Sequence, residues 1–546
     1  MILSNRTPLE CMYYWESNTP DDVYLRQAKS LEWTEYTWQQ VGDRVRRIAS
    51  YINSFNLPNS SRIALWSSNS ADWVMLDLAI MLSGHVSVPL YPGQDIDSAN
   101  YILDHSECDL MFLGAVDQLA NIAAGKIERK MPRVAMFGCN IECDSTIEDI
   151  VATYSPMLES PVPGDDQMMT ILYTSGTTGN PKGVVHVHGT PGKVVTRMIK
   201  DWKLSTDGRE RYFSFLPLSH AAERIAVEMV SFYHSPSVSF SEGLATFADE
   251  IRSVQPTFFF AVPRLWAKFK AGVDAKIPPA MQAGLGEEQK AQIRAMLGLS
   301  KAKFIITGSA PCPIDIQEWF INMGIQLRDG YGMTENFIDG CIFNDPEPIP
   351  GCVGKPFEGT FVKISDEGEV CFKGPGNMVG YYKNPEKTAE VMIDGWYHTG
   401  DSGRIDENGN LWVTGRLGEV FKTTKGKFVK PTSLENKLGG VHILGQLMIF
   451  GHGKDQPLLL TNLSEVGHAG GKSREEMTEQ LESALADINS DLPPYEKIAQ
   501  IFITKDDWTI ANQLLTPTMK LKRAQIESHY SSLITANLGG NTVVWE

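Results

Sequence analysis

One stretch of the chain concentrates hydroxyl groups, glycines and a lysine, and these residue types can bind phosphate. It runs from Tyr173 to Val184 and reads YTSGTTGNPKGV. Glycine lets the backbone approach a ligand closely, and successive backbone N–H groups in such a loop form a concavity that binds anions. The hydroxyl groups add donors, and Lys182 adds a mobile positive charge. The pattern therefore predicts a loop that binds a phosphate group.

The loop does not follow the Walker A pattern of kinases and P-loop ATPases. That pattern ends in Gly-Lys-Ser/Thr, whose hydroxyl group holds magnesium, whereas Gly183 comes directly after Lys182 here. A kinase or P-loop ATPase is therefore disfavoured. Composition alone also allows a flexible surface loop without a ligand, so the other polar segments of the chain must decide between the two.

Several later segments place polar or charged residues where a short apolar run ends. A histidine at such a junction is more often structural than functional, and a lone carboxylate or lysine is usually a solvated side chain. The segments are His220 with its neighbours, Gly308–Pro311, Asp329–Glu335, Asp401, Arg416 and Lys520. No single segment predicts a function, so their order along the chain carries the information.

The elements that must position these residues predict an open α/β fold. Short apolar strands alternate with helix-length spacers, a pattern typical of βαβ units and a parallel sheet. Thr37 is placed to cap a helix whose apolar face runs from Val41 to Ile52. Strands are expected at 62–66, 86–90, 109–113, 134–137, 168–173, 212–217, 304–307 and 325–328, and a helix at 71–82. The polar loops after the later strands should share one edge of a sheet, where doubly wound α/β proteins bind ligands.

From about residue 350 the pattern changes to short strands joined by tight turns. Expected strands at 369–373 and 411–414 lie next to turn signals, which predicts a small β-barrel or sheet. After Arg416 a smaller region begins, in which Ser473 and Glu476 form a capping box for a helix. This region predicts a second, smaller domain.

The bulk properties limit the possible classes of protein. The chain has 546 residues, more than one core of roughly 250–300 residues can hold, so two or more domains are expected. A net charge of −17 argues against nucleic acid as the main partner. The eight cysteines show no metal-ligand spacing, which indicates reduced thiols in a reducing compartment. The N-terminus lacks the features of a signal peptide, and no run of 18 apolar residues occurs, so a cytoplasmic protein is expected.

In their order, the polar segments resemble the motifs of the adenylate-forming superfamily, which includes acyl- and aryl-CoA synthetases, luciferases and the adenylation domains of peptide synthetases. The resemblance runs from residue 173 to residue 520 and covers essentially the whole chain. Three segments are similar to long-chain fatty acyl-CoA synthetases in particular: LPLSHAAER at 216–224, PTFFFAVPRLWAKF at 256–269 and LTPTMKLKR at 515–523. The resemblance implies a large domain, residues 1–416, of two doubly wound α/β subdomains and a small β-barrel. It also implies a small mobile α+β domain, residues 417–546, that carries a catalytic lysine.

The resemblance also assigns roles to individual residues. It implies catalytic roles for Lys520, Glu335 and His220, with the histidine lining the passage between the adenylate and the acyl tunnel. It implies that the β and γ phosphates of ATP are held by Thr174, Ser175, Gly176, Thr177, Thr178 and Lys182. It implies a nucleotide-binding surface made by Gly308, Ser309, Ala310, Asp329, Gly330, Tyr331, Gly332, Thr334, Asp401 and Arg416. Glu335 and Thr174 are expected beside a magnesium ion.

The implied reaction activates a fatty carboxylic acid of long or medium chain length. The carboxylate attacks the α-phosphorus of ATP, which gives an acyl-adenylate and pyrophosphate, and the thiolate of coenzyme A then displaces AMP. Two anions must meet, so Mg²⁺, Lys520 and the loop N–H groups would neutralise charge where it develops. Peripheral association with the inner face of a membrane stays open because the substrate partitions into bilayers. The sequence also leaves open whether the protein is a monomer or a homodimer.

Several positions depart from the family pattern. Gly418 stands at the hinge between the domains, where relatives usually carry Asp or Lys, so we expect the domain rotation with an altered conformational preference. Lys425 replaces a glycine in the Lys425–Lys427 loop, which the resemblance implies should approach the pantetheine of CoA. Met519 stands where many relatives have glycine, and Lys522 is a competing candidate for the catalytic lysine.

Three other functions remain as alternatives. The main one is transfer of the acyl group to a carrier protein, because the 417–430 segment is atypical. An oxidase of the luciferase kind is disfavoured by the three long-chain-type segments. A non-catalytic fatty-acid- or nucleotide-binding protein is disfavoured because Lys520, Glu335 and Asp401 are all present. An acyl tunnel is expected near 228–233 and 258–262, and its length cannot be read from the sequence.

Overall fold

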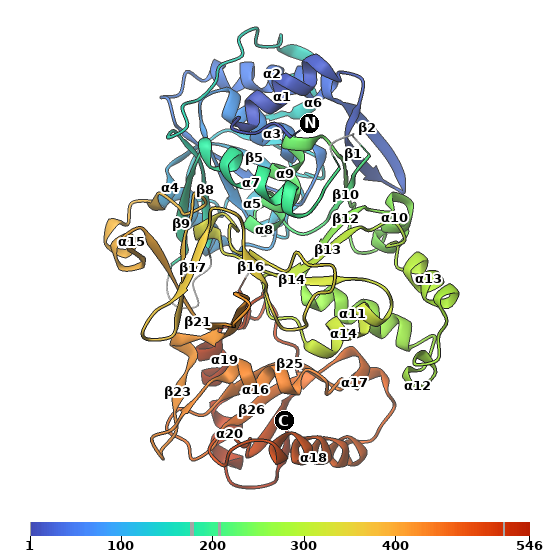
Figure 1. Ribbon diagram of the computed structural model, residues 1–546. Helices are drawn as coiled ribbons and strands as arrows, with labels where there is room; N and C mark the ends of the chain where they lie inside the picture. The colour runs from blue at the N-terminus through green and yellow to red at the C-terminus, as the bar shows by residue number, and fades with distance from the viewer. Residues whose placement is uncertain (1, 175–179, 206–208, 517–518) are drawn as a thin grey trace.

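Two large sheets with helices around them form most of the computed structural model (Figure 1). The structure describes residues 2–174, 180–205, 209–516 and 519–546. The first sheet has eight strands, in the order β19 (Gly380–Tyr381), β9 (Lys182–Val187), β8 (Met168–Thr174), β4 (Val86–Leu90), β3 (Arg62–Trp66), β5 (Cys108–Leu113), β6 (Arg133–Ala135) and β7 (Ser145–Thr146). Its strands from β8 to β7 pair in parallel, as the alternation of strands and helices predicts. β9 pairs with β8 in the antiparallel direction, and β19 pairs with β9 in the same way.

The second sheet has nine strands and contains an N-terminal hairpin that sequence patterns do not predict. Its order is β16 (Lys355–Pro356), β15 (Cys341–Ile342), β14 (Leu327–Tyr331), β13 (Phe304–Gly308), β12 (Phe258–Ala261), β10 (Arg211–Ser214), β11 (Ser237–Phe240), β1 (Val23–Lys29) and β2 (Glu32–Thr37). The strands from β14 to β1 are parallel. β1 pairs Leu25 with Val238 of β11, so a contact between distant parts of the chain places it there.

The helices before residue 420 agree with the predicted alternation. They are α1 (Pro8–Asn18), α2 (Trp38–Ser54), α3 (Ala71–Leu82), α4 (Ile96–Ser106), α5 (Leu119–Ala123), α6 (Ile147–Thr153), α7 (Gly189–Asp201), α8 (Ala221–Glu223), the π-helix η1 (Arg224–Met229), α9 (Val230–His234), α10 (Phe247–Val254), α11 (Pro263–Asp274), α12 (Pro279–Gln282), α13 (Glu287–Met296), α14 (Ile314–Asn322), η2 (Thr334–Asn336), α15 (Pro385–Val391) and η3 (Leu417–Glu419). The predicted cap of α2 is confirmed, because Thr37 and Gln40 form a capping box. The predicted helix at 71–82 is α3.

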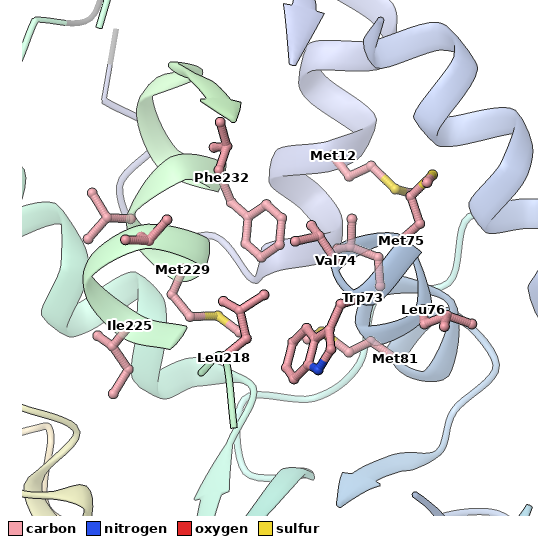
Figure 2. Packing of buried hydrophobic residues seen from close by; sticks show 14 of the residues in the cluster. Met12, Trp73, Val74, Met75, Leu76, Met81, Leu218, Ile225, Met229 and Phe232 are labelled. Carbon is pink, nitrogen blue, oxygen red and sulfur yellow. The ribbon is translucent and has the colours of Figure 1, made fainter. Parts of the chain in front are cut away.

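The main hydrophobic core lies between α3 and the segment that runs from α8 through η1 to α9. Figure 2 shows Trp73 and Val74 of α3 facing Met229 and Phe232, and these side chains belong to one buried cluster. Every residue of α3 is buried, and all but two of them, Asp72 and Asp77, are apolar, as expected for a helix inside the core. Among the residues that the structure describes, no helix has the length and apolar character needed to cross a membrane.

A five-stranded antiparallel sheet and a smaller C-terminal region complete the fold. The predicted barrel or sheet consists of β17 (Phe361–Ile364), β18 (Glu369–Lys373), β20 (Met392–Ile393), β21 (Trp396–Ile405) and β22 (Leu411–Arg416). The C-terminal region, red in Figure 1, contains a hairpin, a four-stranded sheet and five helices: β23 (Phe421–Lys422), β24 (Phe428–Val429), β25 (Leu444–Phe450), β26 (Leu458–Leu463), β27 (Gln500–Thr504), β28 (Val543–Trp545), α16 (Pro431–Leu438), α17 (Glu465–Ala469), α18 (Arg474–Ser490), α19 (Arg523–His529) and α20 (Ser531–Asn537). The predicted capping box of α18, between Ser473 and Glu476, is present.

Candidate functional site

Two paired strands hold a carboxylate and a guanidinium group side by side. Asp401 in β21 lies opposite Arg416, the last residue of β22, and Arg416 Nε lies 2.9 Å from Asp401 Oδ1. From the second large sheet, the hydroxyl group of Tyr331 donates to Asp401 Oδ2 at 2.5 Å. Burial raises the pKa of Asp401, and the Arg416 charge and the Tyr331 hydrogen bond oppose that rise. Three residues predicted for the nucleotide site therefore form one contact group.

A second buried carboxylate, Glu335, lies in the turn that follows β14. The hydroxyl group of Tyr381 donates to Glu335 Oε1 at 2.9 Å. The turn is fixed by His186, whose Nε2 donates to the carbonyl oxygen of Thr334 at 2.7 Å. Burial lowers the pKa of His186 to about 4, so the imidazole is neutral at pH 7. A Cβ at Gly332 would lie 2.7 Å from the Cα of Ile338, so only glycine fits there.

The hairpin of β8 and β9 holds both ends of the phosphate loop predicted from the sequence. Thr174 pairs with Lys182 across the two strands, and Thr174 Oγ1 donates to the Lys182 carbonyl oxygen at 3.4 Å. The predicted loop residues Ser175, Gly176, Thr177 and Thr178 lie outside the described part of the chain. Lys182 Nζ lies 5.0 Å from the ring centroid of Tyr381. Burial lowers the pKa of Lys182, and the nearby carboxylate of Glu335 opposes this effect.

A cavity of about 400 Å³ lies between these groups. Ionisable side chains of both signs line it: Lys182, Glu335, Glu369, Lys387, Glu390, His398 and Arg416. Such a lining can hold a phosphate group on the cations and a hard metal ion on a carboxylate. Lys182, Glu335 and Arg416 stand in sequence motifs, but the lysine and the glutamate of α15 do not. That helix buries none of its residues, so its pattern is that of any solvated helix.

Lys520, the predicted catalytic lysine, lies in the small C-terminal region. The backbone of Lys520 is fixed by Thr516, whose Oγ1 accepts from the Lys520 N–H at 3.1 Å. More than a third of the Lys520 surface is exposed, yet surrounding protein lowers the pKa of its ammonium group, and the Arg416 charge adds to that effect. The carboxylates of Asp401 and Glu335 act in the opposite direction. Lys520 therefore lies within electrostatic range of both predicted carboxylates.

His220 lies at the junction predicted from the sequence, as the N-cap of α8. Its Nδ1 accepts from the N–H of Ala222 at 3.1 Å. Burial, with a smaller contribution from Lys520, lowers the pKa of His220 to about 4. The imidazole is therefore neutral at pH 7, and since Nδ1 is an acceptor, the ring hydrogen is on Nε2. The ring centroid lies 6.2 Å from that of Tyr91. His220 can therefore donate a hydrogen bond beside Lys520 without adding charge.

Strands β13 and β14 place two segments of the predicted nucleotide-binding surface, Gly308–Pro311 and Asp329–Glu335, next to each other. Gly308 pairs with Gly330, and a Cβ at Gly308 would lie 2.9 Å from the Gly330 carbonyl oxygen, so a larger residue does not fit. Ser309, which has a φ of 68°, and Ala310 follow directly. Burial raises the pKa of Asp329 to about 8, and the backbone N–H groups of Cys312 and Gly330 oppose that rise. The Asp329 carboxyl group therefore connects the second segment to Cys312, the residue that directly follows the first.

The segments predicted for an acyl tunnel lie in the packed core. Residues 228–233 are buried, and so are Phe258, Phe259, Phe260 and Ala261. The main chain of the first segment accepts a hydrogen bond at the Phe232 carbonyl oxygen from Trp15 Nε1, at 2.7 Å. An acyl chain in this region must therefore displace side chains that are packed together here.

Met519 has a φ of 61°, in the left-handed region that favours glycine. We expect the variant Met519→Gly to be more stable than Met519→Ala by about 1 kcal/mol, because glycine removes the steric strain of a Cβ at positive φ. The side chain of Met519 is 46% exposed, so its packing contributes little. Thermal unfolding of the two variants, which both lack the methionine side chain, measures the difference. An alanine variant as stable as the glycine variant would contradict the prediction.

The chain matches two related protein families on the two sides of the predicted domain boundary. Residues 14–382 match the family described as AMP-binding enzyme. Residues 419–538 match the family described as AMP-binding enzyme C-terminal domain. The residues that line the cavity come partly from the first of these regions and partly from 387–416, which lies between the two, and Lys520 comes from the second.

Similar proteins span the full length of this chain. Long-chain-fatty-acid--CoA ligase FadD15 of Mycobacterium tuberculosis is 26% identical, with 95% of each chain covered. Long-chain-fatty-acid--CoA ligase 1 of Homo sapiens is 27% identical, with 95% of this chain and 83% of the human chain covered. Among solved structures, the anthranilate CoA ligase AuaEII in complex with anthranoyl-AMP has a TM-score of 0.80 at 20% identity, covering 98% of this chain and 99% of that one. This structural likeness shows the adenylate-forming fold.

Proposed function

The chain belongs to the family of AMP-binding enzymes and is a ligase, and from this premise we propose that it converts a fatty carboxylic acid into its acyl-CoA thioester. The carboxylate oxygen attacks the α-phosphorus of ATP, and pyrophosphate leaves with the electron pair of the broken bond. The thiolate of coenzyme A then attacks the acyl carbon, and AMP leaves. One observation carries the proposal: Lys520 of the small region lies within electrostatic range of Asp401, Arg416 and Glu335 of the large one.

The first step needs positive charge where two anions meet. We assign this role to Lys520, whose ammonium group offsets charge at the α-phosphate as the carboxylate approaches. His220, neutral and with its hydrogen on Nε2, lines the passage to the acyl group and donates a hydrogen bond without repelling Lys520. Asp401 and Arg416 take the ribose, and Tyr331 packs against the adenine. The hydrogen bond between Tyr331 and Asp401 pre-positions the nucleotide surface.

The phosphate end of ATP belongs in the cavity beside Lys182. We assign the β and γ phosphates to Lys182, Thr174 and the loop residues 175–178. Glu335 fits a magnesium ion, because it is a buried carboxylate beside the cavity and only its Oε1 accepts from Tyr381. Mg²⁺ in phosphate sites usually has one or two carboxylate ligands together with phosphate oxygens. When bound, magnesium supplies positive charge at the phosphate oxygens.

A fatty acid is the proposed substrate class. Support comes from the long-chain-type segments at 216–224, 256–269 and 515–523 and from relatives that are named long-chain-fatty-acid--CoA ligases. A cytoplasmic location is part of the proposal. All eight cysteines, whose positions the structure describes, are unpaired thiols, which supports a reducing compartment.

Transfer to a carrier protein instead of CoA is the competing second step, and one assay separates the two. Pyrophosphate release and AMP formation are measured with and without CoA, across acids of increasing chain length. AMP formation that depends on CoA and favours long acids supports the CoA ligase. Pyrophosphate release that CoA does not accelerate would favour a carrier protein, and a complete absence of pyrophosphate release would favour a non-catalytic binding protein.

We propose that the domain boundary lies between Arg416, where β22 ends, and Leu417, where η3 begins. Gly418 lies in η3, and no atom lies within 4 Å of a Cβ placed there. A lysine at this position therefore fits and can make a polar contact that glycine cannot make. The hinge is expected to rotate between the two half-reactions.

We expect Gly418→Lys to change the ratio of the two half-reaction rates about 3- to 10-fold, because a new contact in one domain orientation shifts the equilibrium between the two. Single-turnover rates of acyl-adenylate formation and of thioester formation measure the ratio. Gly418→Ala, which adds a Cβ without a polar group, is the matched control. If both rates are unchanged in the lysine variant, position 418 has no role in the rotation.

A further inference from the structure

The cavity beside Lys182 has one wall that the sequence motifs do not include, the short helix α15. Lys387, Glu390 and Val391 of this helix line the cavity together with Lys182 and Glu335. The helix is anchored at its start, because the side chain of its N-cap residue accepts from the N–H of Lys387 at 3.0 Å. It is joined to the loop hairpin by β19, which pairs with β9. The position of Lys387 on the same cavity as Lys182 is therefore set by the fold.

Lys387 is close enough to Lys182 for its positive charge to lower the pKa of the Lys182 ammonium group. Burial is the largest cause of the lowered pKa of Lys182, and the positive charges of Lys387 and Arg416 lower it further. The carboxylates of Glu335 and Glu390 have the opposite effect. Three cations thus converge on one cavity, and a polyanion placed between them would relieve their mutual repulsion.

Lys387 is free to exchange its present partner. Its Nζ forms an ion pair with Glu390 Oε2, and both side chains are partly exposed, 39% and 59% of their surfaces respectively. Exposed pairs between neighbouring helical residues contribute little stability. Phosphate oxygens form strong charge-assisted hydrogen bonds with lysine, so a phosphate group in the cavity can compete with the Glu390 carboxylate.

We propose that Lys387 is a second lysine of the site for the pyrophosphate end of ATP, and that Glu390 holds it away from the phosphates until they enter the cavity. The inference rests on the proposed function. When the carboxylate oxygen bonds to the α-phosphorus, the bond from that phosphorus to the bridging oxygen breaks, and its electron pair stays on pyrophosphate. Lys387 stays protonated throughout and offsets the charge that develops on this leaving group.

The test compares Lys387→Met with Lys383→Met in the full-length protein. Lys383 lies on the same connection, but its Nζ pairs with Glu107 at 3.0 Å and it is not part of the cavity lining. We expect Lys387→Met to raise the inhibition constant of pyrophosphate and the KM for ATP about 5- to 10-fold, as for the loss of one charge-assisted contact. The rate of thioester formation from supplied acyl-adenylate and CoA should stay unchanged. Lys383→Met should leave all three quantities unchanged.

Glu390→Gln should change the affinity for pyrophosphate in the opposite direction to Lys387→Met. With the carboxylate removed, Lys387 should bind pyrophosphate about 2- to 3-fold more tightly. A merely structural role of α15 would instead make both variants weaker in the same direction. Equal constants for Lys387→Met and wild type, or weaker pyrophosphate binding in Glu390→Gln, would overturn the inference. A wild-type protein without exchange of pyrophosphate into ATP would overturn the proposed function itself.

Discussion

Lys520→Ala is expected to slow acyl-adenylate formation about 10²- to 10³-fold, the usual cost of removing one group that stabilises charge in a transition state. Lys520 comes from the small region, and its ammonium group interacts with Asp401, Glu335 and Arg416. No other lysine of that region is assigned to the α-phosphate. The same variant should form the thioester from supplied acyl-adenylate and CoA at the wild-type rate, because the phosphate attack is already complete.

Lys522→Ala is the matched control, since Lys522 is two residues away and is the rival candidate from the sequence. The Lys522 N–H donates to the Leu514 carbonyl oxygen, and the residue caps α19. We expect Lys522→Ala to keep most of its activity in both half-reactions. The measurements are pyrophosphate release for the first step and AMP release from acyl-adenylate for the second. Equal losses in both steps for Lys520→Ala, or a larger loss of adenylation for Lys522→Ala, would contradict this division of roles.

Local sequence patterns predict the elements of this protein well, because short-range interactions decide them. The helix of α2 follows from a cap at Thr37 and an apolar face, and both are present. The helix at 71–82 and the strands at 62–66 and 86–90 have the predicted bounds. In contrast, β1 belongs to the second sheet only because Leu25 pairs with Val238. A pairing across that separation leaves no local signal.

The candidate site shows the same division between local and long-range information. Lys182, Glu335, Asp401, Arg416 and Lys520 each stand in a recognisable motif, and the structure brings them near one cavity. Some of their partners are in motifs too, as Arg416 and Tyr331 are for Asp401, but others are not. The partner of Glu335 is the hydroxyl group of Tyr381, from a separate edge strand. Such a partner depends on which strands become neighbours, so only the fold identifies it.

The long-chain-type segment LPLSHAAER contains a residue whose role the motif does not predict. Arg224 begins the π-helix η1 and is 1% exposed. Its Nη2 donates to both oxygens of Asp77 in α3, at 2.8 and 2.6 Å. Its Nη1 donates to Thr170 Oγ1 of β8 at 2.7 Å, and its Nε lies 3.4 Å from Glu228. The guanidinium group thus joins the π-helix to the first large sheet and to the helix α3 that packs beside it.

Arg224→Met is expected to destabilise the protein by about 3–5 kcal/mol, the usual cost of removing one partner from a buried ion pair. Asp77 would then keep a buried charge without a counter-ion, because it is 0% exposed. Burial, followed by the charge of Asp77, raises the pKa of Glu228 well above its usual range, which favours the neutral form of this carboxyl group. Thermal unfolding should show a fall in Tm of roughly 3–6 °C, because the unfolding entropy of a domain of this size is large.

Two companion variants test whether the uncompensated charge is the cause. In Arg224→Met combined with Asp77→Asn, both charges are absent, and most of the lost stability should return, because replacing both partners of a buried pair is often close to neutral. Glu228→Gln should cost only about 1 kcal/mol, since the raised pKa of Glu228 favours a neutral carboxyl group, for which glutamine is a close substitute. If the double variant is no more stable than Arg224→Met, the loss comes from packing of the arginine side chain in the core. In that case the cluster of Asp77, Arg224 and Glu228 would be important for its shape and not for its charge balance.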